Sequence, residues 1–356
     1  MNTKVDYLIV GQGLAGTALS YKLLEQGLTV HVLDVFKSNT ATRIAAGVFN
    51  PVTYRKLKMA EFADILIPSV FDFYPKIGKS LGIDIFQSTS FLKILTNIEE
   101  LNNWQIQCAN EKNRAFMSET TFTDDFEHTI KNPFGAGQVL QSGVVKLSSL
   151  LDAWKNHLLS KNSFTDEHFD YSKLIISDSN IQYGEIEADK IVFCEGVGIA
   201  KNPWFNWLPM QQFKGEVLEI SAPDLKLTRM VNRGVFLLPL ENGNYKVGAT
   251  HDWKNVDEET TQEGKKELTD KLDNIINVPY QVVKHEAGLR PATRDRHPYI
   301  GVHPRHKNMF VMNGLGSKGV IMAPWLAHTF ITGMGELKWP KGFDITRYLR
   351  FYNETN

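Results

Sequence analysis

Hydrophobic positions near the start of the chain predict a strand, a helix and a second strand in close succession. Residues 5–10 are apolar and rich in β-branched side chains, as in a buried parallel strand. Apolar side chains at helical spacing follow, and Gly27 is typical of the residue that ends a helix. A second apolar run at 28–33 leads directly into Asp34. This order predicts a βαβ unit of a parallel sheet.

The middle of the chain has a different pattern. Residues 60–140 predict a mixture of helix and strand, with many aromatic side chains and no recognisable chemistry. A helix is expected at 148–159, with Ser148 as its N-cap. Between 213 and 248 short strand-like segments follow one another, and 241–244 have the composition of a hairpin turn. This part is typical of an antiparallel sheet.

The last third returns to the α/β pattern. Residues 309–313 predict a strand, after which Gly314, Gly316 and Gly319 form a second glycine-rich turn, and Val320 opens a long helix. The chain therefore has a strand–glycine–helix module near each end. Because a helix N-terminus attracts negative charge, both modules are expected to face one anionic cofactor.

Length and composition limit the number of domains and the classes of function to be considered. A chain of 356 residues is longer than one core usually supports, so two domains are expected. The net charge of −1 gives no general attraction for nucleic acid. Two cysteines make no disulfide framework and no metal-ligand spacing occurs, so no metal site is predicted. The lack of a signal-peptide layout or a long apolar span predicts a cytoplasmic protein.

Residues 11–16 have the form G-x-G-x-x-G between the first strand and its helix. In such a turn the first glycine permits a tight bend, the second lets the backbone approach a pyrophosphate, and the third lets the helix pack closely on the strand. Asp34 follows the last glycine by 18 residues, where a carboxylate accepts hydrogen bonds from ribose hydroxyls. The complete unit predicts a dinucleotide site, with contacts from Gly11, Gly13, Leu14, Ala15, Gly16 and Asp34.

Two further glycine segments are candidates for contact with a flat ligand. Small residues surround Gly47 in the segment 43–52, although taken alone this segment is better explained as an ordinary turn. A buried strand at 191–194 ends in Glu195 and Gly196, where a ligand can approach the backbone.

Together these motifs resemble the glycine/D-amino-acid oxidase (DAO) family of FAD enzymes. The resemblance rests on GQGLAG at 11–16, AAGVFNP at 45–51, CEG at 194–196, and most specifically on 287–301 and 314–324. The last two segments are similar to glycine oxidase. They are also similar to the flavin domain of the bacterial bifunctional enzyme that matures 5-methylaminomethyl-2-thiouridine in tRNA.

The resemblance implies an α/β fold, α+β overall, that binds FAD. It implies a Rossmann-like FAD-binding domain with a parallel sheet and a smaller substrate domain with an antiparallel sheet. We expect the discontinuous FAD-binding domain at 1–75, 141–210 and 286–356, and the substrate domain at 76–140 and 211–285. Further cofactor contacts are expected from Arg43, Ala45, Ala46, Gly47, Val145, Gly196, Gly314, Gly316, Ser317, Lys318, Gly319 and Val320.

The resemblance also implies a substrate-binding arginine in the G-L-R-P segment, which here is Arg290. A guanidinium holds a carboxylate through two parallel hydrogen bonds and so orients the carbon to be oxidised. A structural ion pair is the alternative for this arginine. In glycine oxidase a second arginine lies in the turn that corresponds to 314–319, where this chain has Ser317 and Lys318. The catalytic candidates are therefore Arg290, Ser317 and Lys318.

The expected function is oxidation of the C–N bond of a small amine or amino acid by hydride transfer to flavin, with O2 or a carrier as electron acceptor. Three alternatives stay open: a free-standing tRNA wobble-uridine carboxymethylaminomethyl oxidoreductase, an amine dehydrogenase with a non-oxygen acceptor, and a non-catalytic flavin-binding protein. The tRNA alternative is secondary, since the chain has no room for the methyltransferase domain of the bifunctional enzyme. Its support besides the resemblance is the basic run Lys284, Arg290, Arg294, Arg296, Arg305 and Lys307.

Overall fold

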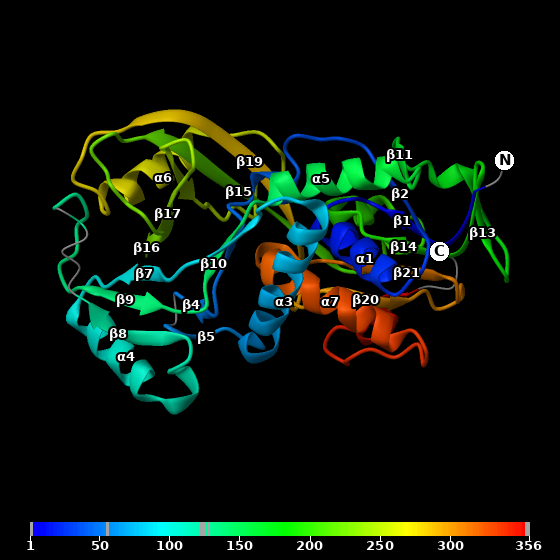
Figure 1. Ribbon diagram of the computed structural model, residues 1–356, viewed down its shortest axis with the longest axis horizontal. Coiled ribbons are helices and arrows are strands. Elements are labelled where there is room, and N and C mark those ends of the chain that lie inside the picture. The colour runs from blue at the N-terminus through cyan, green and yellow to red at the C-terminus, as the bar shows by residue number, and fades with distance from the viewer. Residues whose placement is uncertain (1–2, 55–56, 122–125, 127, 353–356) are drawn as a thin grey trace.

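A computed structural model describes residues 3–54, 57–121, 126 and 128–352 (Figure 1). The predicted βαβ unit forms from β1 (Thr3–Val10), α1 (Leu14–Glu25) and β2 (Val30–Asp34). β1 and β2 pair in parallel. Gly27 adopts φ +76°, and its N–H donates to the Leu24 carbonyl, which confirms its predicted place at the end of the helix.

This unit belongs to an eight-stranded sheet that occupies the right half of Figure 1. Its main path runs β11-β2-β1-β14-β13-β12, with β21 beside β14 and β20 beside β21. The pairs β11–β2, β2–β1, β1–β14 and β14–β21 are parallel, whereas β12–β13, β13–β14 and β20–β21 are antiparallel. The added strands are β11 (Phe164–Asp166), β12 (Leu174–Ile176), β13 (Ile181–Tyr183), β14 (Ile186–Phe193), β20 (Tyr299–Val302) and β21 (Met309–Asn313).

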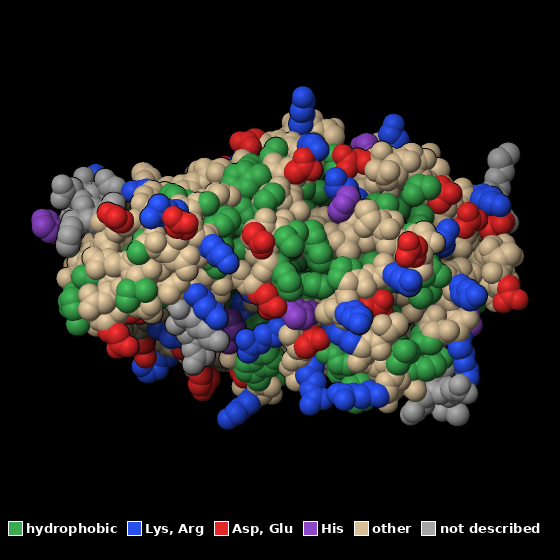
Figure 2. All heavy atoms as spheres, turned by 90° about the horizontal axis from the view of Figure 1, so that it is seen from below, with side chains coloured by type: hydrophobic (Ala, Val, Ile, Leu, Met, Phe, Trp, Pro, Cys, Tyr) green, Lys and Arg blue, Asp and Glu red, His purple; other side chains and the backbone are tan. Residues whose placement is uncertain are grey.

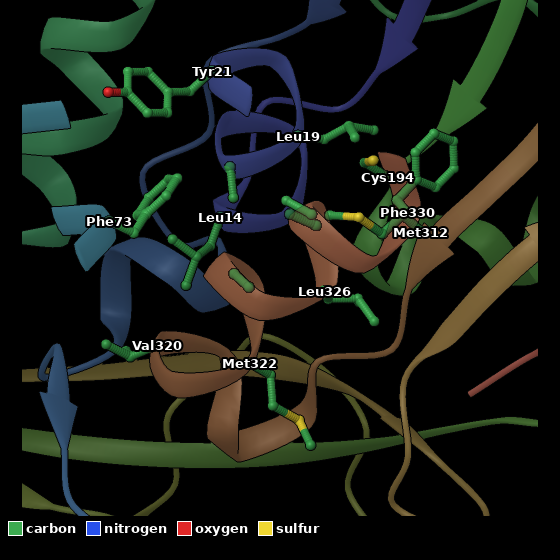
Figure 3. Close-up of a cluster of buried hydrophobic side chains, with 14 of the residues drawn as sticks. Leu14, Leu19, Tyr21, Phe73, Cys194, Met312, Val320, Met322, Leu326 and Phe330 are labelled. Carbon is green, nitrogen blue, oxygen red and sulfur yellow. The ribbon is translucent and has the colours of Figure 1, made fainter. Parts of the chain in front are cut away.

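Three helices besides α1 pack around this sheet. They are α3 (Ala63–Leu81), α5 (Leu147–Ser160) and α7 (Gly319–Gly333). Figure 3 shows α1 and α7 facing each other through a buried cluster that includes Leu14 and Leu326, with Phe73 of α3 at its side. The Tyr74 hydroxyl of α3 donates to the Val320 carbonyl at 2.8 Å. The second glycine turn is thus held against the first through a shared core.

The N-cap predicted at Ser148 is wrong, because α5 begins one residue earlier. The strand ladder continues to Lys146, whose N–H donates to the Ile85 carbonyl at 2.9 Å. The Lys146 carbonyl then accepts from the Leu150 N–H at 3.0 Å and closes the first helical turn. Lys146 occupies the cap position without a side-chain hydrogen bond.

A second eight-stranded sheet forms the left half of Figure 1, in the order β19-β15-β18-β17-β16-β7-β9-β8. Its strands are β7 (Phe91–Ile94), β8 (Met117–Thr121), β9 (Ala136–Val139), β15 (Met210–Ser221), β16 (Val231–Arg233), β17 (Val235–Pro239), β18 (Tyr245–Gly248) and β19 (Gln281–Thr293). The predicted turn at 241–244 joins β17 to β18. Helices α4 (Ile98–Ala109) and α6 (Gln262–Asp273) pack on this sheet.

Smaller elements join the two sheets. They are α2 (Ala41–Ile44), the three-stranded sheet of β3 (Val48–Phe49), β10 (Gly143–Val145) and β6 (Phe86–Ser88), and the pair β4 (Val52–Thr53) and β5 (Lys58–Met59). The long strands β15 and β19 reach from the second sheet toward the first (Figure 1). The expected combination of a largely parallel sheet and a largely antiparallel sheet is confirmed, although β16 and β7 pair in parallel within the second sheet. The domain boundaries stay a prediction. No helix in the described ranges has the length and apolarity needed to span a bilayer.

Candidate functional site

The three glycines of the first turn have three different surroundings. Gly11 adopts φ +99°, and an added Cβ would lie 2.6 Å from the Cys194 carbonyl oxygen. An added Cβ on Gly16 would lie 1.9 Å from the Gly11 carbonyl oxygen, so α1 touches the turn. The atom nearest to an added Cβ on Gly13 would be Thr42 Oγ1, at 3.7 Å. Gly13 therefore has open space beside it, as a backbone that approaches a pyrophosphate requires.

The start of α1 offers free N–H groups at this open space. Gly13 occupies the N-cap position without a side-chain hydrogen bond, and the first turn holds no acidic residue. The Leu14 N–H donates to Thr42 Oγ1 at a long 3.3 Å. Ala15 follows in the same first turn and is buried. A helix N-terminus with no side-chain cap from its own N-cap residue, beside a glycine, has the features that favour anion binding.

A pocket lies next to this turn, at the carboxyl ends of β1 and β2. Its lining includes Asp34, whose carboxylate accepts from the backbone N–H groups of Gln12 (3.0 Å) and Val35 (2.9 Å). Burial raises the pKa of Asp34, while these two N–H donors lower it. Other lining residues are Phe36, Lys37, Arg43, Leu151, Lys155 and Phe164. A fixed carboxylate among rings and cations suits the sugar and phosphates of a dinucleotide.

The segment around Gly47 contacts the end of β10, which brings together two of the predicted cofactor contacts, Gly47 and Val145. Gly47 adopts φ +69°, its carbonyl accepts from the Val145 N–H at 2.9 Å, and an added Cβ would lie 1.9 Å from the Val145 carbonyl oxygen. Ala45 and Ala46 connect this contact to α2, where Arg43 pairs with Asp152 at 2.5 Å. The guanidinium also lies 4.7 Å from the Phe36 ring centroid.

The second glycine turn is joined to the end of β14 by Asn313. Its side-chain amide donates to the Gly196 carbonyl at 3.0 Å, and its side-chain oxygen accepts from the Gly314 N–H at 2.7 Å. Gly196, Gly314 and Gly316 all have positive φ, at 58°, 79° and 56°. The turn continues through η5 (Gly316–Lys318) into α7, and an added Cβ on Gly319 would lie 3.5 Å from Leu14 Cδ2. The N-termini of α1 and α7 therefore lie side by side.

Arg290 lies on β19 directly opposite Phe213 of β15. Its guanidinium crosses Gly215, where an added Cβ would come within 2.1 Å of Arg290 Nη2, and its central carbon lies 5.0 Å from the Phe213 ring centroid. One of its N–H groups donates to the Thr250 carbonyl at 3.2 Å. Burial lowers the pKa of Arg290 to about 10, so the side chain stays protonated at neutral pH.

Arg290 has no carboxylate partner within the described ranges. This sets it apart from Arg347, whose Nε pairs with Asp295 at 2.8 Å. A guanidinium has five N–H donors, so most of those of Arg290 remain for a ligand. Arg290 is half-buried, and a cation partly removed from water without an acid partner is stabilised when a ligand supplies the negative charge, which fits a site for a substrate carboxylate.

Ser317 and Lys318 lie on η5 and are exposed. An added Cβ on Gly316, next to them, would lie 3.8 Å from Ala292 of β19, two residues beyond Arg290. Lys318 is also the N-cap residue of α7, without a side-chain hydrogen bond, and Val320 is buried in the shared core. The turn is thus adjacent to the Arg290 strand, and the roles of Ser317 and Lys318 stay a prediction.

The residues of the basic run considered for tRNA are spread along the chain from β19 to the segment after β20. Lys284 pairs with Glu286 at 2.6 Å on β19, whereas Arg294 and Arg296 precede β20 and Arg305 and Lys307 follow it. On the face in Figure 2, positive and negative side chains are interspersed.

Two features of the site escaped the sequence prediction. Gly215 lies in the interior of β15, and a glycine inside a strand marks close approach of another group. That signal was available in the sequence. The position of Phe213 beside Arg290 depends on the pairing of β15 with β19, for which the sequence offers no local signal.

Comparisons with known proteins agree with this geometry. A family model described as FAD dependent oxidoreductase (DAO) matches residues 6–331. Glycine oxidase of Bacillus subtilis (strain 168) is 22% identical over 354 residues, which cover 91% of each chain. The crystal structure of glycine oxidase from Bacillus cereus ATCC 14579 matches with a TM-score of 0.77 and 18% identity, over 94% of this chain and 96% of that one.

A second kind of relative is a tRNA-modifying enzyme. The tRNA 5-methylaminomethyl-2-thiouridine biosynthesis bifunctional protein MnmC of Marinobacter nauticus (strain ATCC 700491 / DSM 11845 / VT8) is 23% identical over 352 residues. The match covers 90% of this chain but only 54% of that protein.

Proposed function

Because the chain belongs to the DAO family of FAD-dependent oxidoreductases, we propose that it oxidises the C–N bond of a small amine or amino acid that carries a carboxylate. The observation that carries this proposal is Arg290, a half-buried cation with no acid partner in the described part of the chain. Similarity to glycine oxidase supports the same class of substrate.

The residues of the two glycine turns fit the cofactor of the family. The bare backbone at Gly13 and the free N–H groups of α1 would hold the pyrophosphate, and Asp34 would accept hydrogen bonds from a ribose. The N-terminus of α7 would stabilise negative charge on the flavin ring. When bound, FAD would supply the two-electron acceptor that oxidation of a C–N bond requires.

The protein's own residues bind and orient the substrate. The guanidinium of Arg290 would hold the carboxylate through paired hydrogen bonds, and Gly215 leaves the space in which this group lies flat against the sheet. The Phe213 ring holds the guanidinium from the side at 5.0 Å. These contacts fix the position of the charge before the substrate arrives, which lowers the cost of orienting the substrate.

The test is anaerobic bleaching of the bound flavin by glycine, sarcosine, D-amino acids, proline and 5-carboxymethylaminomethyluridine. Bleaching by a member of this panel would support amine oxidation and name the substrate class. Dithionite serves as the control for a reducible flavin. If dithionite bleaches the flavin and no amine does, the proposal is wrong and a non-catalytic flavoprotein becomes the better account.

The nucleoside belongs in the panel because the chain is similar to MnmC over 90% of its length. Its substituent combines a secondary amine with a carboxylate, the two groups that the Arg290 site would address. The electron acceptor is a separate question. Rapid reoxidation of the reduced protein by air would support an oxidase, and slow reoxidation would support a dehydrogenase that uses another acceptor.

A further inference from the structure

The chain stays paired with β15 for a short distance beyond the end of β18. Two residues after Gly248, the Thr250 N–H donates to the Glu216 carbonyl at 3.1 Å. Two residues further on, the backbones of Asp252 and Lys214 exchange two hydrogen bonds, of 2.8 and 3.0 Å. In an antiparallel ladder, opposite residues of a hydrogen-bonded pair exchange both of their N–H···O=C bonds. The pair of Asp252 and Lys214 follows this rule and provides the standard for its neighbour.

The pair of Thr250 and Glu216 departs from this rule. The Glu216 N–H donates to the Thr250 hydroxyl oxygen at 2.8 Å, so the donor that a regular ladder would supply to the Thr250 carbonyl is taken. The hydroxyl thus stands in the place of the backbone carbonyl. The released carbonyl accepts instead from an N–H of the Arg290 guanidinium, with 3.2 Å between the oxygen and Nη1. One side chain therefore turns a backbone acceptor away from the ladder and toward the proposed substrate cation.

The Thr250 carbonyl accepts the one hydrogen bond that the Arg290 side chain donates within the described ranges. The Phe213 ring, 5.0 Å from the central carbon of the guanidinium, and the bare backbone of Gly215 define the space in which this group lies. Contact with a ring face or with a glycine depends little on rotation of the guanidinium in its plane, whereas a hydrogen bond weakens steeply when it is misaligned. Thr250 is 3% exposed, so water has little access to this bond. The carbonyl therefore sets the orientation of the guanidinium.

The strand that presents the Glu216 N–H is fixed from its opposite face. Lys214 and Glu216 flank Gly215 on β15, and they are 0% and 1% exposed. The Lys214 ammonium donates to the Asp257 carboxylate at 2.8 Å. The Glu216 carboxylate accepts from the Thr261 N–H at 3.0 Å and from the Thr261 hydroxyl at 2.8 Å. Because charges buried this deeply are costly to separate from their partners, the Glu216 N–H has a fixed position to which the Thr250 hydroxyl must come.

We propose that Thr250 is a positioning residue for substrate oxidation: its hydroxyl replaces its own carbonyl in the ladder, which frees that carbonyl to orient the Arg290 guanidinium for a substrate carboxylate. This inference rests on the proposed function and adds a residue to the same site. Orientation matters because a carboxylate is held best by two parallel N–H donors, and a guanidinium that has turned presents only one of them well. A guanidinium that is oriented in advance also loses less freedom when the ligand binds.

A simpler account gives the Thr250 hydroxyl only the task of closing the ladder, with Phe213 and Gly215 sufficient to orient Arg290. On that account, loss of the hydroxyl changes stability but treats charged and neutral ligands alike. The experiment therefore compares binding of methoxyacetate with that of methoxyacetamide to the FAD-loaded protein, monitored by the visible flavin spectrum. Both ligands have the size of sarcosine and lack its amine, and they differ only in the carboxylate.

The wild type should bind methoxyacetate about tenfold more tightly than methoxyacetamide, or better, because a charged carboxylate meets the guanidinium. Thr250→Val keeps the shape of the side chain but removes the acceptor, so the Glu216 N–H should recapture the backbone carbonyl. The ratio of the two affinities should then fall by about three- to tenfold, the effect of one hydrogen bond. Thr250→Ser keeps the hydroxyl and should keep the ratio. An equal ratio in wild type and Thr250→Val, or an equal fall in Thr250→Ser, overturns the inference.

Two further variants control for effects on the fold. Thr329→Val makes the same change at a buried threonine in the second half of α7 and should leave the ratio unchanged. If Thr250→Val does not fold or does not hold FAD, Thr250→Cys is compared with Thr250→Ser, because sulfur is a much weaker acceptor than oxygen in a side chain of similar shape. The ratio should be lower in Thr250→Cys, and equal ratios in these two variants overturn the inference.

Failure of the proposed function would look different. If the wild type binds neither ligand or binds both equally well, or if Arg290→Met keeps the ratio of the wild type, the carboxylate site at Arg290 is wrong and Thr250 has nothing to position. If Arg290→Met abolishes the preference and Thr250→Val leaves it intact, the carboxylate site stands and only the inference about Thr250 falls.

Discussion

The two glycine turns of the cofactor region and the Arg290 site of the antiparallel sheet are built in different ways. In the cofactor region the contacts come from the backbone of short, contiguous segments, such as Gly11, Gly13 and Gly16. At Arg290 they come from side chains on separate strands, brought together by the pairing of β15 with β19. The first kind of site depends on the absence of side chains, the second on their presence.

The largest effect is expected from Gly16→Ala. The new Cβ would lie 1.9 Å from the Gly11 carbonyl oxygen, so α1 and the turn would have to move apart. We expect loss of bound FAD and a fall in folding stability of about 3 kcal/mol or more, as for severe overpacking. Thermal unfolding and the flavin content of the purified protein measure both effects.

Gly13→Ala is the matched variant, because its Cβ would meet nothing closer than 3.7 Å. This variant should fold normally and still bind FAD more weakly, since the methyl group would enter the space left for the pyrophosphate. Equal stability losses in the two variants would contradict the separate roles assigned to these glycines.

A large effect on catalysis, without an effect on folding, is expected from Arg290→Met. Loss of the paired hydrogen bonds to a carboxylate should lower kcat/KM by about 100-fold or more, corresponding to about 3 kcal/mol. Unfolding stability should be equal or higher, since a half-buried cation without an acid partner in the described ranges is removed. Steady-state kinetics measure the change in kcat/KM, and thermal melts measure the change in stability. A marked loss of stability would point to a structural role for Arg290 instead.

A smaller effect is expected from Gly215→Ala, which tests the positioning of the same guanidinium. The added methyl group would lie 2.1 Å from Arg290 Nη2 and would push the guanidinium away from the sheet. We expect an increase in KM of about tenfold, since a shift of about 1 Å disturbs orientation. Unchanged KM would show that Arg290 binds nothing that depends on its present position.

The smallest expected effect concerns the pH dependence of stability. Burial raises the pKa of Glu195 to about 7, against the Tyr171 and Asn202 hydrogen bonds that lower it. The folded protein holds this proton more tightly than the unfolded chain, so the contribution to stability falls as pH rises from about 4.5 to about 7.

Glu195→Gln should remove this dependence. Its melting temperature, relative to the wild type, should increase over the same pH range, and flavin reduction by the best amine should change little. Parallel melting curves for the two proteins at all pH values would contradict the assignment.

The sequence could predict the cofactor region because its signals are local. Alternation of strand and helix periods, three glycines within six positions and a carboxylate at the next strand end all lie within residues 5–34. The N-cap at Ser148 failed because a distant carbonyl, that of Ile85, extends the strand ladder to Lys146. Local preference was outweighed there by a tertiary hydrogen bond.

The Arg290 site was only partly predictable because most of its contacts join residues that are distant in sequence. Arg290 was identified through the family resemblance, whereas Phe213 approaches it through the pairing of two strands that are distant in sequence. Gly215 was the one local signal, since a glycine in a strand weakens it unless another group needs the space. Sites built from side chains across strands therefore need the strand register, which the sequence pattern does not provide.

The most direct test of the account is the anaerobic rate of flavin reduction by sarcosine compared with sarcosinamide, in the wild type and in Arg290→Met. The two amines differ only in the replacement of the carboxylate by a neutral amide. We predict that the wild type prefers sarcosine by about 100-fold and that Arg290→Met loses this preference. Equal rates for the two amines in the wild type, or a preference that survives in Arg290→Met, would contradict a carboxylate-anchored amine oxidation.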